Sequence, residues 1–515
     1  MKPTTTSLLA AVAALGAITA LAAATAPGAP VTEVAAKLTP RLPIERSNLL
    51  CPAPSNAEVA ETTYTSFTPK PSRPPHPTRP ATGTAELRPG TVQLVANAAG
   101  SAEKPDGTSA GKPVLSLAVP GKPVTATVNG SDAPALVGTA DGHLAPGWTA
   151  QQTTAVTAGE ARGLLGTACT GPDTEAWFPG ASTAEGRRDY LHLTNPDDAH
   201  SVVDIELYGA DGQLKTTLPD GLSVPARGST PVLLSTLTTE AVPDLTVRVT
   251  TRSGRVGAVV RTAEDTVGSD WLAASADPAA TAVLPGIPAD ATSVRLVVFA
   301  PGEADAELKV QLAGPGGSLV PAGHETVRVK SGMTTTVDLA DVTKGEPGSL
   351  LLTPAHKGLN TPVVAALRVV RGTKAAQEVA FVPAAEPVGE RASVADNRAQ
   401  GTTLSLTAPT ATSKVRVTAS TGTGGGEPTT ATYTVKAGTT LAFAPPVPDG
   451  LTGSYGLTVE TVSGGPVHAA RTLALPRRGV QMFTIQTLTY DRGTVAVPEV
   501  ERDLSVLDDR AGTGS

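Results

Sequence analysis

Two histidines lie within ten residues of each other at only one place in this sequence. The seven histidines are scattered as His76, His143, His192, His200, His324, His356 and His468. Of these, His192 and His200 flank the segment Asn195-Pro196-Asp197-Asp198, whose side chains could chelate a cation. The spacing is not that of an EF-hand loop, and Asx side chains at turns usually bond their own backbone. We therefore expect a capped turn here and no metal site.

The chain lacks several motifs of catalytic sites. It contains no H-E-x-x-H, no Walker A motif and no G-x-G-x-x-G after a strand. A glycosidase carboxylate pair leaves no local pattern, because its two groups meet only in the folded protein. Glycan sites usually contain stacking aromatics, and the three tryptophans are Trp148, Trp177 and Trp271. We expect Trp177-Phe178 to be core, and we predict no catalytic residue and no cofactor.

The two cysteines, Cys51 and Cys169, form an even pair. A metal site would need more soft ligands nearby, and a catalytic thiol would need a spatially adjacent histidine, which the sequence leaves open. In an exported protein, the pair predicts a structural disulfide. Closing so long a loop would stabilise the fold by about 4–5 kcal/mol.

The elements that must position these residues are short strands in repeats. Residues 190–214 and 295–319 align without a gap, and a looser copy begins near Leu404. Leu191 and Leu193, then Val203, Ile205 and Leu207, alternate with polar residues, which is the period of a half-buried strand. Gly-rich turns such as Asp211-Gly212 separate the strands. The pattern predicts an all-β chain of tandem antiparallel β-sandwiches, immunoglobulin-like or fibronectin-like.

The repeats give a provisional division of the chain. We expect a signal peptide or membrane anchor at 1–27, a Pro-rich extended segment at 28–83, and a divergent β-domain at 84–170. Three sandwich repeats follow at 171–286, 287–388 and 389–490, and an acidic flexible tail occupies 491–515. Arginines recur late in each repeat, at Arg261, Arg368 and Arg471. They could form a row of ligand-binding groups, but we favour strand-end residues with their heads in water.

The N-terminus carries an export signal. Lys2 precedes an uncharged run at 7–24 that ends in Ala22-Ala23-Ala24 and is followed by Pro27, which is typical of a signal peptide. The run is also long enough to serve as an uncleaved anchor, so a membrane contact is expected only there. We therefore place the bulk of the chain outside the cytoplasm.

The composition excludes one class of partner. The 515 residues include 52 Gly and 46 Pro but only 17% charged residues, with a formal net charge of −7. Nucleic-acid binding requires a basic surface, so we expect no nucleic-acid partner.

Three segments resemble a known family. The run CTGPDTEAWFPGAS at 169–182, the LHLTNPDD turn at 191–198 and the Cys51-Pro-Ala-Pro segment are similar to an actinobacterial family of exported proteins, domain of unknown function 5719. The resemblance covers about 45–490. It implies export and supports the cysteine pair, and it brings no functional residues with it.

The sequence leaves two hypotheses for the function. The first is a non-catalytic exported or cell-envelope protein, whose tandem sandwiches act as a structural or binding scaffold for a protein or a cell-wall polymer. The second is a cell-envelope glycan-active hydrolase with its site between domains, for which a deep pocket with paired carboxylates would be required. The absence of clustered histidine, cysteine or carboxylate motifs favours the first. The oligomeric state does not follow from the sequence.

Overall fold

The computed structural model describes residues 41–55, 57–71, 82–93, 111–159, 161–218, 220–373, 376–477 and 480–497. The expected signal or anchor at 1–27, the centre of the Pro-rich run and the end of the acidic tail lie outside the described residues. Residues Pro43–Val495 form one compact unit, and the described residues 41–42 and 496–497 belong to a second. No helix in the described part of the chain is long and apolar enough to span a bilayer.

The fold of the described residues is all-β. Strand β13 (Ser201–Gly209) illustrates why: its apolar residues alternate with polar ones, and the alternate positions are buried. Val203, Ile205 and Leu207 face a shared core, while Asp204 and Glu206 face outward. Pairs of such sheets pack face to face around apolar clusters, so that Pro43–Val495 consists of four antiparallel β-sandwiches.

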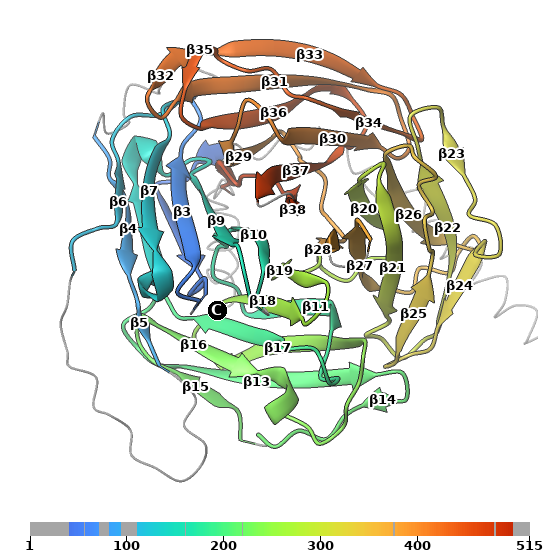
Figure 1. The fold of residues 1–515 in the computed structure, drawn as a ribbon. Helices are drawn as coiled ribbons and strands as arrows, with labels where there is room; N and C mark the ends of the chain where they lie inside the picture. The colour runs from blue at the N-terminus through green and yellow to red at the C-terminus, as the bar shows by residue number, and fades with distance from the viewer. Residues whose placement is uncertain are drawn as a thin grey trace, which may run out of the picture. The chain divides into compact units, whose positions relative to one another are not determined.

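Each sandwich has an outer sheet and a sheet that contributes one strand to the centre of the unit (Figure 1). In the first sandwich the outer sheet has the order β2-β8-β4-β6 and its partner β10-β9-β3-β7. These strands are β2 (Arg46–Cys51), β3 (Ala60–Phe67), β4 (Ala85–Pro89), β6 (Leu115–Leu117), β7 (Val124–Asn129), β8 (Leu136–Asp141), β9 (Thr149–Val156) and β10 (Gly163–Ala168). The 3₁₀ turns are η1 (Gly130–Asp132) and η2 (Gly142–Leu144).

The second sandwich pairs β11-β17-β13-β14, with β15 also on β13, with β19-β18-β12-β16-β5. Its elements are β5 (Thr91–Val92), β11 (Glu175–Ala181), β12 (Tyr190–Thr194), β13, β14 (Gly212–Gln213), β15 (Leu222–Val224), β16 (Gly228–Leu233), η3 (Leu234–Thr236), β17 (Leu245–Ser253), β18 (Gly257–Glu264) and β19 (Gly268–Leu272). Strand β5 adds in parallel to the edge of β16, so a segment from the first quarter of the chain extends the second sandwich.

The third sandwich pairs β20-β26-β22-β23, with β24 also on β22, with β25-β21-β27-β28. Its strands are β20 (Ala282–Ile287), β21 (Ala291–Phe299), β22 (Ala306–Ala313), β23 (Ser318–Leu319), β24 (Thr326–Val329), β25 (Thr334–Asp338), β26 (Gly348–Pro354), β27 (Val364–Arg371) and β28 (Glu378–Pro383).

The fourth sandwich pairs β29-β36-β31-β33 with β34-β30-β37-β38. Its strands are β29 (Arg391–Asn397), β30 (Thr402–Ala408), β31 (Ser413–Gly422), β33 (Thr429–Val435), β34 (Thr439–Phe443), β36 (Tyr455–Gly464), β37 (His468–Arg477) and β38 (Val480–Leu488). Two small sheets complete the set, one of β32 (Gly425–Glu427) with β35 (Asp449–Thr452) and one of β1 (Arg41–Pro43) with β39 (Thr494–Ala496).

The sequence repeats occupy equivalent places in these sandwiches. The aligned segments form the strands β12–β14, β21–β23 and β30–β32. The first strand of each set, β12, β21 or β30, lies between two antiparallel neighbours. Strand β3 has this position in the first sandwich, between β7 and β9. The first sandwich is therefore a fourth copy of the same arrangement.

The expected extended segment at 28–83 differs from the structure in part. Residues 46–51 and 60–67 are strands β2 and β3 of the first sandwich, because Tyr64 and Phe67 reach the interior and Cys51 is bonded into it. At another expected boundary, β20 lies before residue 287 but belongs to the third sandwich. In the expected tail, 494–496 is strand β39.

Four inner strands, β10, β19, β28 and β38, meet at the centre of the unit and contact one another in cyclic order (Figure 1). Each packs against a neighbouring sandwich. Trp271 of β19 packs with Val156 of the first sandwich, and Phe381 of β28 joins the core of the second. Phe483 of β38 joins the core of the third, and Leu164 of β10 packs against β37 and β38 of the fourth. The four sandwiches therefore close into a ring, which local sequence patterns had not indicated.

Candidate functional site

A disulfide lies where the first sandwich meets the second. Cys51 at the end of β2 is bonded to Cys169 just after β10, with an S–S distance of 2.00 Å, and both residues are buried. Backbone bonds flank the bridge in both directions between Leu50 and Thr170, with N–O distances of 2.8 and 3.0 Å. This is the pair that the sequence suggested, and it closes the N-terminal strand onto the end of its own sandwich.

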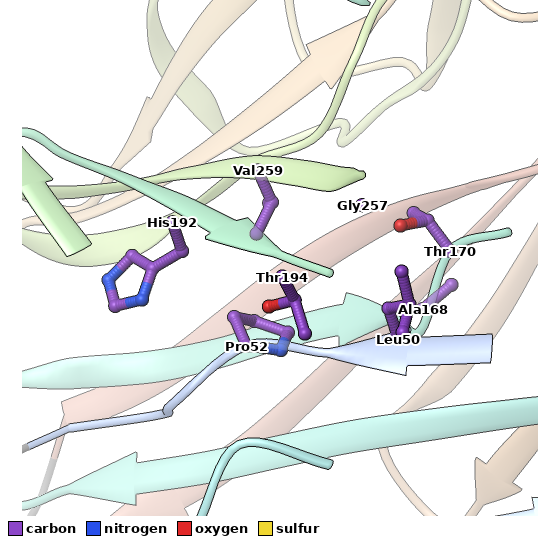
Figure 2. Close-up of a pocket in the computed structure, with 8 residues that line it drawn as sticks. All are labelled: Leu50, Pro52, Ala168, Thr170, His192, Thr194, Gly257 and Val259. Carbon is purple, nitrogen blue, oxygen red and sulfur yellow. The ribbon is translucent and has the colours of Figure 1, made fainter. Parts of the chain in front are cut away.

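A small cavity lies beside this disulfide. Figure 2 shows the residues that line it, which come from both sandwiches: Leu50, Pro52, Ala168, Thr170, His192, Thr194, Gly257 and Val259. Its volume is about 10 Å³, which is close to the minimum for one water molecule. A substrate or cofactor does not fit in such a space.

His192 is the titratable residue of the cavity. It is 3% exposed, and neither ring nitrogen has a hydrogen-bond partner within the described residues. Its ring lies edge-on to Trp271, with a centroid distance of 5.2 Å. Burial, aided by the charge of Arg261, lowers the pKa of His192 well below its usual value. The imidazole is therefore neutral near pH 7, and Thr194 bonds to Ser229 rather than to it. This arrangement is not that of a nucleophile with its base.

A second group of titratable residues lies among the inner strands. Arg162, just before β10, donates from Nη1 to Glu378 Oε1 at 2.5 Å and from Nη2 to the carbonyl oxygens of Val267 and Gln377. One guanidinium thus connects the first, second and third sandwiches.

Asp270 of β19 is the other carboxylate at this centre. Its Oδ1 accepts hydrogen bonds from Gly166 N of β10 and Thr484 Oγ1 of β38, at 3.0 and 3.1 Å. Burial raises the pKa of Asp270 well above its usual value, and nearby Glu378 adds to the rise. Burial likewise raises the pKa of Glu378 to about 7, against the opposing charge of Arg162.

These two carboxylates come from different sandwiches, as the hydrolase hypothesis required, but they are closed from solvent. Asp270 is 0% exposed and Glu378 1%. A polymer cannot reach groups this deep, and their bonds run to the neighbouring sandwiches. The two carboxylates therefore connect the inner strands to one another.

The recurring arginines are not a ligand-binding row, and the expectation of heads in water was wrong for Arg471. Arg471 is 0% exposed and donates to Gln486 Oε1, and burial lowers its pKa to about 10. Arg368 pairs with Glu264 of the second sandwich at 2.6 Å, and Arg261 lies over the ring of Tyr190 at 5.0 Å. Each arginine lies within, and not at the end of, the strand next to an inner strand. Arg368 and Arg261, which also reaches the carbonyl oxygen of Pro54, lie at contacts between sandwiches, whereas Gln486 belongs to the same sandwich as Arg471.

The turn at 195–198 is capped and ion-paired. Asn195 Oδ1 accepts from Asp197 N at 2.9 Å, the expected Asx turn. Asp197 pairs with Arg255 and Asp198 with Arg227. Nowhere in the described ranges do three or more His, Cys, Asp or Glu side chains gather in a way that could hold a metal ion.

The remaining residues singled out from the sequence lie apart. His468 Nδ1 contacts the carbonyl oxygen of Ala385 at 2.8 Å, His200 lies near Ser223, and His356 near Glu307. His76 lies outside the described residues. The tryptophans are core: Trp148 Nε1 donates to Ser66, Trp177 packs on Phe299, and Phe178 is fully buried.

The comparison with known families agrees with the repeats. One family model matches residues 124–446, which is more than half of the chain. The chain belongs to this family, the Family of unknown function (DUF5719). The match runs from β7 of the first sandwich to the end of β34 in the fourth, a shorter span than the 45–490 that the resemblance implied. No curated protein matches the chain. Membership in DUF5719 thus supplies no activity for the buried carboxylates or for His192.

The sequence did not reveal the centre of this DUF5719 chain. Arg162 and Glu378 are 216 residues apart in the sequence, with Asp270 between them, and the three residues belong to three different repeats. One signal was available: each of the three lies in or directly before an inner strand, which is the last strand of its repeat.

Proposed function

We propose that this protein is a non-catalytic, exported scaffold of the cell envelope, which binds a protein or a cell-wall polymer on the outer surfaces of its sandwiches. We further infer that the sandwiches are immunoglobulin-like or fibronectin-like. The single observation that carries the proposal is how the buried charged residues are used: Arg162, Asp270 and Glu378 are bonded across the contacts between sandwiches. The titratable side chains that could act in catalysis thus bond the sandwiches to one another instead of facing a substrate.

The outer sheets offer the binding surface. On the second sandwich, Arg248 lies between Glu175 and Glu206, at 2.8 and 3.2 Å, and Arg252 pairs with Asp204 at 2.7 Å. Partly exposed polar faces with paired charges suit recognition of an extended polymer or a protein surface rather than enclosure of a small molecule.

The location outside the cytoplasm is part of the proposal. The disulfide between Cys51 and Cys169 supports it, since such bridges persist in oxidising compartments. The uncharged run at 7–24 supports it too, as a cleaved signal or as a tether.

The test is a single incubation with two measurements. The purified chain is mixed with cell-wall sacculi from the cells that produce it, and both bound protein and released reducing ends are measured over time. A parallel sample receives solubilised envelope proteins, and stable complexes are identified after chemical cross-linking. We expect saturable binding to sacculi or to one envelope protein, without sugar release. Sugar release in proportion to the amount of protein would refute the scaffold function.

A further inference from the structure

Strand β33 forms an open edge of the fourth sandwich. It is the last strand of its sheet, paired with β31 on one side only. Figure 1 draws it at the outer rim of the unit, far from the inner strands. Within the described residues no other strand or backbone group bonds to it. Because alternate residues of a strand bond to opposite sides, half of its N–H and C=O groups point away from β31.

Between Pro428 and Lys436, which bound it, this edge lacks the devices that normally protect a free strand. Natural edges are short, bulged, or interrupted by Lys or Pro, since an unprotected edge pairs with other chains. Strand β33 has seven residues in regular register with β31, and the sequence TTATYTV contains no charge and no proline. Strand β7, the other long outer edge without a charge, has six.

The core beneath β33 is also incompletely covered. The rings of Tyr433 and Phe443 stack at a centroid distance of 4.0 Å. Together with Leu441 they pack on the core of the fourth sandwich but remain partly exposed, at the side where β33 and β34 end the two sheets. Another strand beside β33 would bury this apolar surface, which favours association.

The charges that flank β33 determine which orientation fits. Glu427 lies just before the strand and Lys436 just after it, and both are exposed. No ion pair involves either residue within the described ranges. If two copies of β33 pair antiparallel, Glu427 near the start of each strand comes within one position of Lys436 at the end of the other, whereas parallel pairing would put like charges together.

We propose that β33 is a dimerisation edge, to which a second copy of this chain adds antiparallel with Thr432 opposite Thr432. This register places Thr430 opposite Thr434 and the small Ala431 opposite the large Tyr433. It joins two four-stranded sheets into one of eight strands. The dimer is independent of what the scaffold binds.

Engineered cysteines test the register directly. Both native cysteines are used in the disulfide, so an added cysteine is the only free thiol. Residues directly opposite in an antiparallel pair have Cα atoms about 4.5–5.5 Å apart, within the range of a disulfide. We expect Thr432→Cys to form a covalent dimer on mild oxidation. Thr434→Cys alone should not, but a mixture of Thr434→Cys with Thr430→Cys should. Cross-linking of Thr434→Cys without Thr432→Cys would overturn the proposal.

Charge reversal gives a second, reversible test. In light scattering coupled to size exclusion, Thr432→Lys and Thr432→Glu should each shift the dimer to monomer by at least tenfold in Kd. An equimolar mixture of the two variants should restore it, which a misfolded variant could not do. Thr127→Lys, the matched substitution on β7, should leave the dimer intact. A wild-type chain that stays monomeric at about 100 µM, or one that is disrupted by Thr127→Lys and not by Thr432→Lys, would overturn the assignment.

Discussion

Replacing Glu378 with glutamine should change how the stability of the ring depends on pH. Glu378 is buried between the inner strands, where Arg162 from the first sandwich donates to its Oε1. Its Oε2 has no hydrogen-bond partner within the described residues, so its ionised form is only half satisfied. Glutamine keeps the size and one acceptor oxygen but carries no charge at any pH.

The magnitude follows from the pKa. Burial raises the pKa of Glu378 from 4.5 to about 7 in the folded chain. A raised pKa means that the folded state holds the proton more tightly, so the stabilisation is complete below pH 4.5 and is lost as the pH rises through 7. At about 1.4 kcal/mol per pKa unit, the wild type should lose about 3 kcal/mol through this group between pH 4.5 and 8. Glu378→Gln should lose none of it.

The assay is urea unfolding followed by tryptophan fluorescence, at several pH values from 4.5 to 8.5. Trp271 lies on an inner strand and reports on the centre. The difference in unfolding free energy between Glu378→Gln and wild type should shift in favour of the variant by about 3 kcal/mol across this range. Glu303→Gln, in an exposed loop of the third sandwich, serves as the matched control. A flat difference for Glu378→Gln would show that its carboxylate is satisfied at high pH, and the reasoning would fail.

Three further predictions concern the disulfide, a core ring and a buried arginine. Removing the disulfide by Cys51→Ser with Cys169→Ser should lower the unfolding free energy by about 5 kcal/mol, because the bridge closes a span of 118 residues; denaturant titration measures the loss. Phe381→Ala should lower the unfolding free energy by about 3–5 kcal/mol in the same titration, because the Phe381 side chain belongs to the third sandwich but packs in the core of the second. Leu359→Ala, at a side chain that is 47% exposed, is the control and should change the unfolding free energy by less than about 0.5 kcal/mol. In thermal unfolding, Arg471→Ala should destabilise by about 3–5 kcal/mol and Arg471→Met by less, because both leave Gln486 Oε1 without its donor but only alanine also leaves a hole.

The sequence was sufficient where burial alternates along one strand. The pattern of Val203, Ile205 and Leu207 is local, so it identified β13 and, by repetition, β22 and β31. It failed for β3, whose buried positions include Thr62 and Thr65. Hydroxyls at buried positions remove the alternation of polarity on which such a prediction depends.

The centre of the ring could not be predicted for a different reason. Asp270 is a single acidic residue in GSDWL, and in one dimension it resembles a turn residue. Its environment is made by Gly166 and Thr484, which precede and follow it by more than 100 residues. Only the closed ring brings these three strands together, and no repeat contains information about how the first sandwich meets the last.

Ring closure also changes what tandem repeats mean for function. Sandwiches joined only by linkers would move independently. Here Leu164 of the first sandwich packs on Leu473 of the fourth, and Asp270 of the second bonds to both of those sandwiches. Opening one junction would therefore expose a buried carboxylate together with apolar surface at neighbouring junctions, which makes partial opening costly. A scaffold built this way would hold its outer sheets in fixed relative orientation, and the polar groups at its centre provide that rigidity.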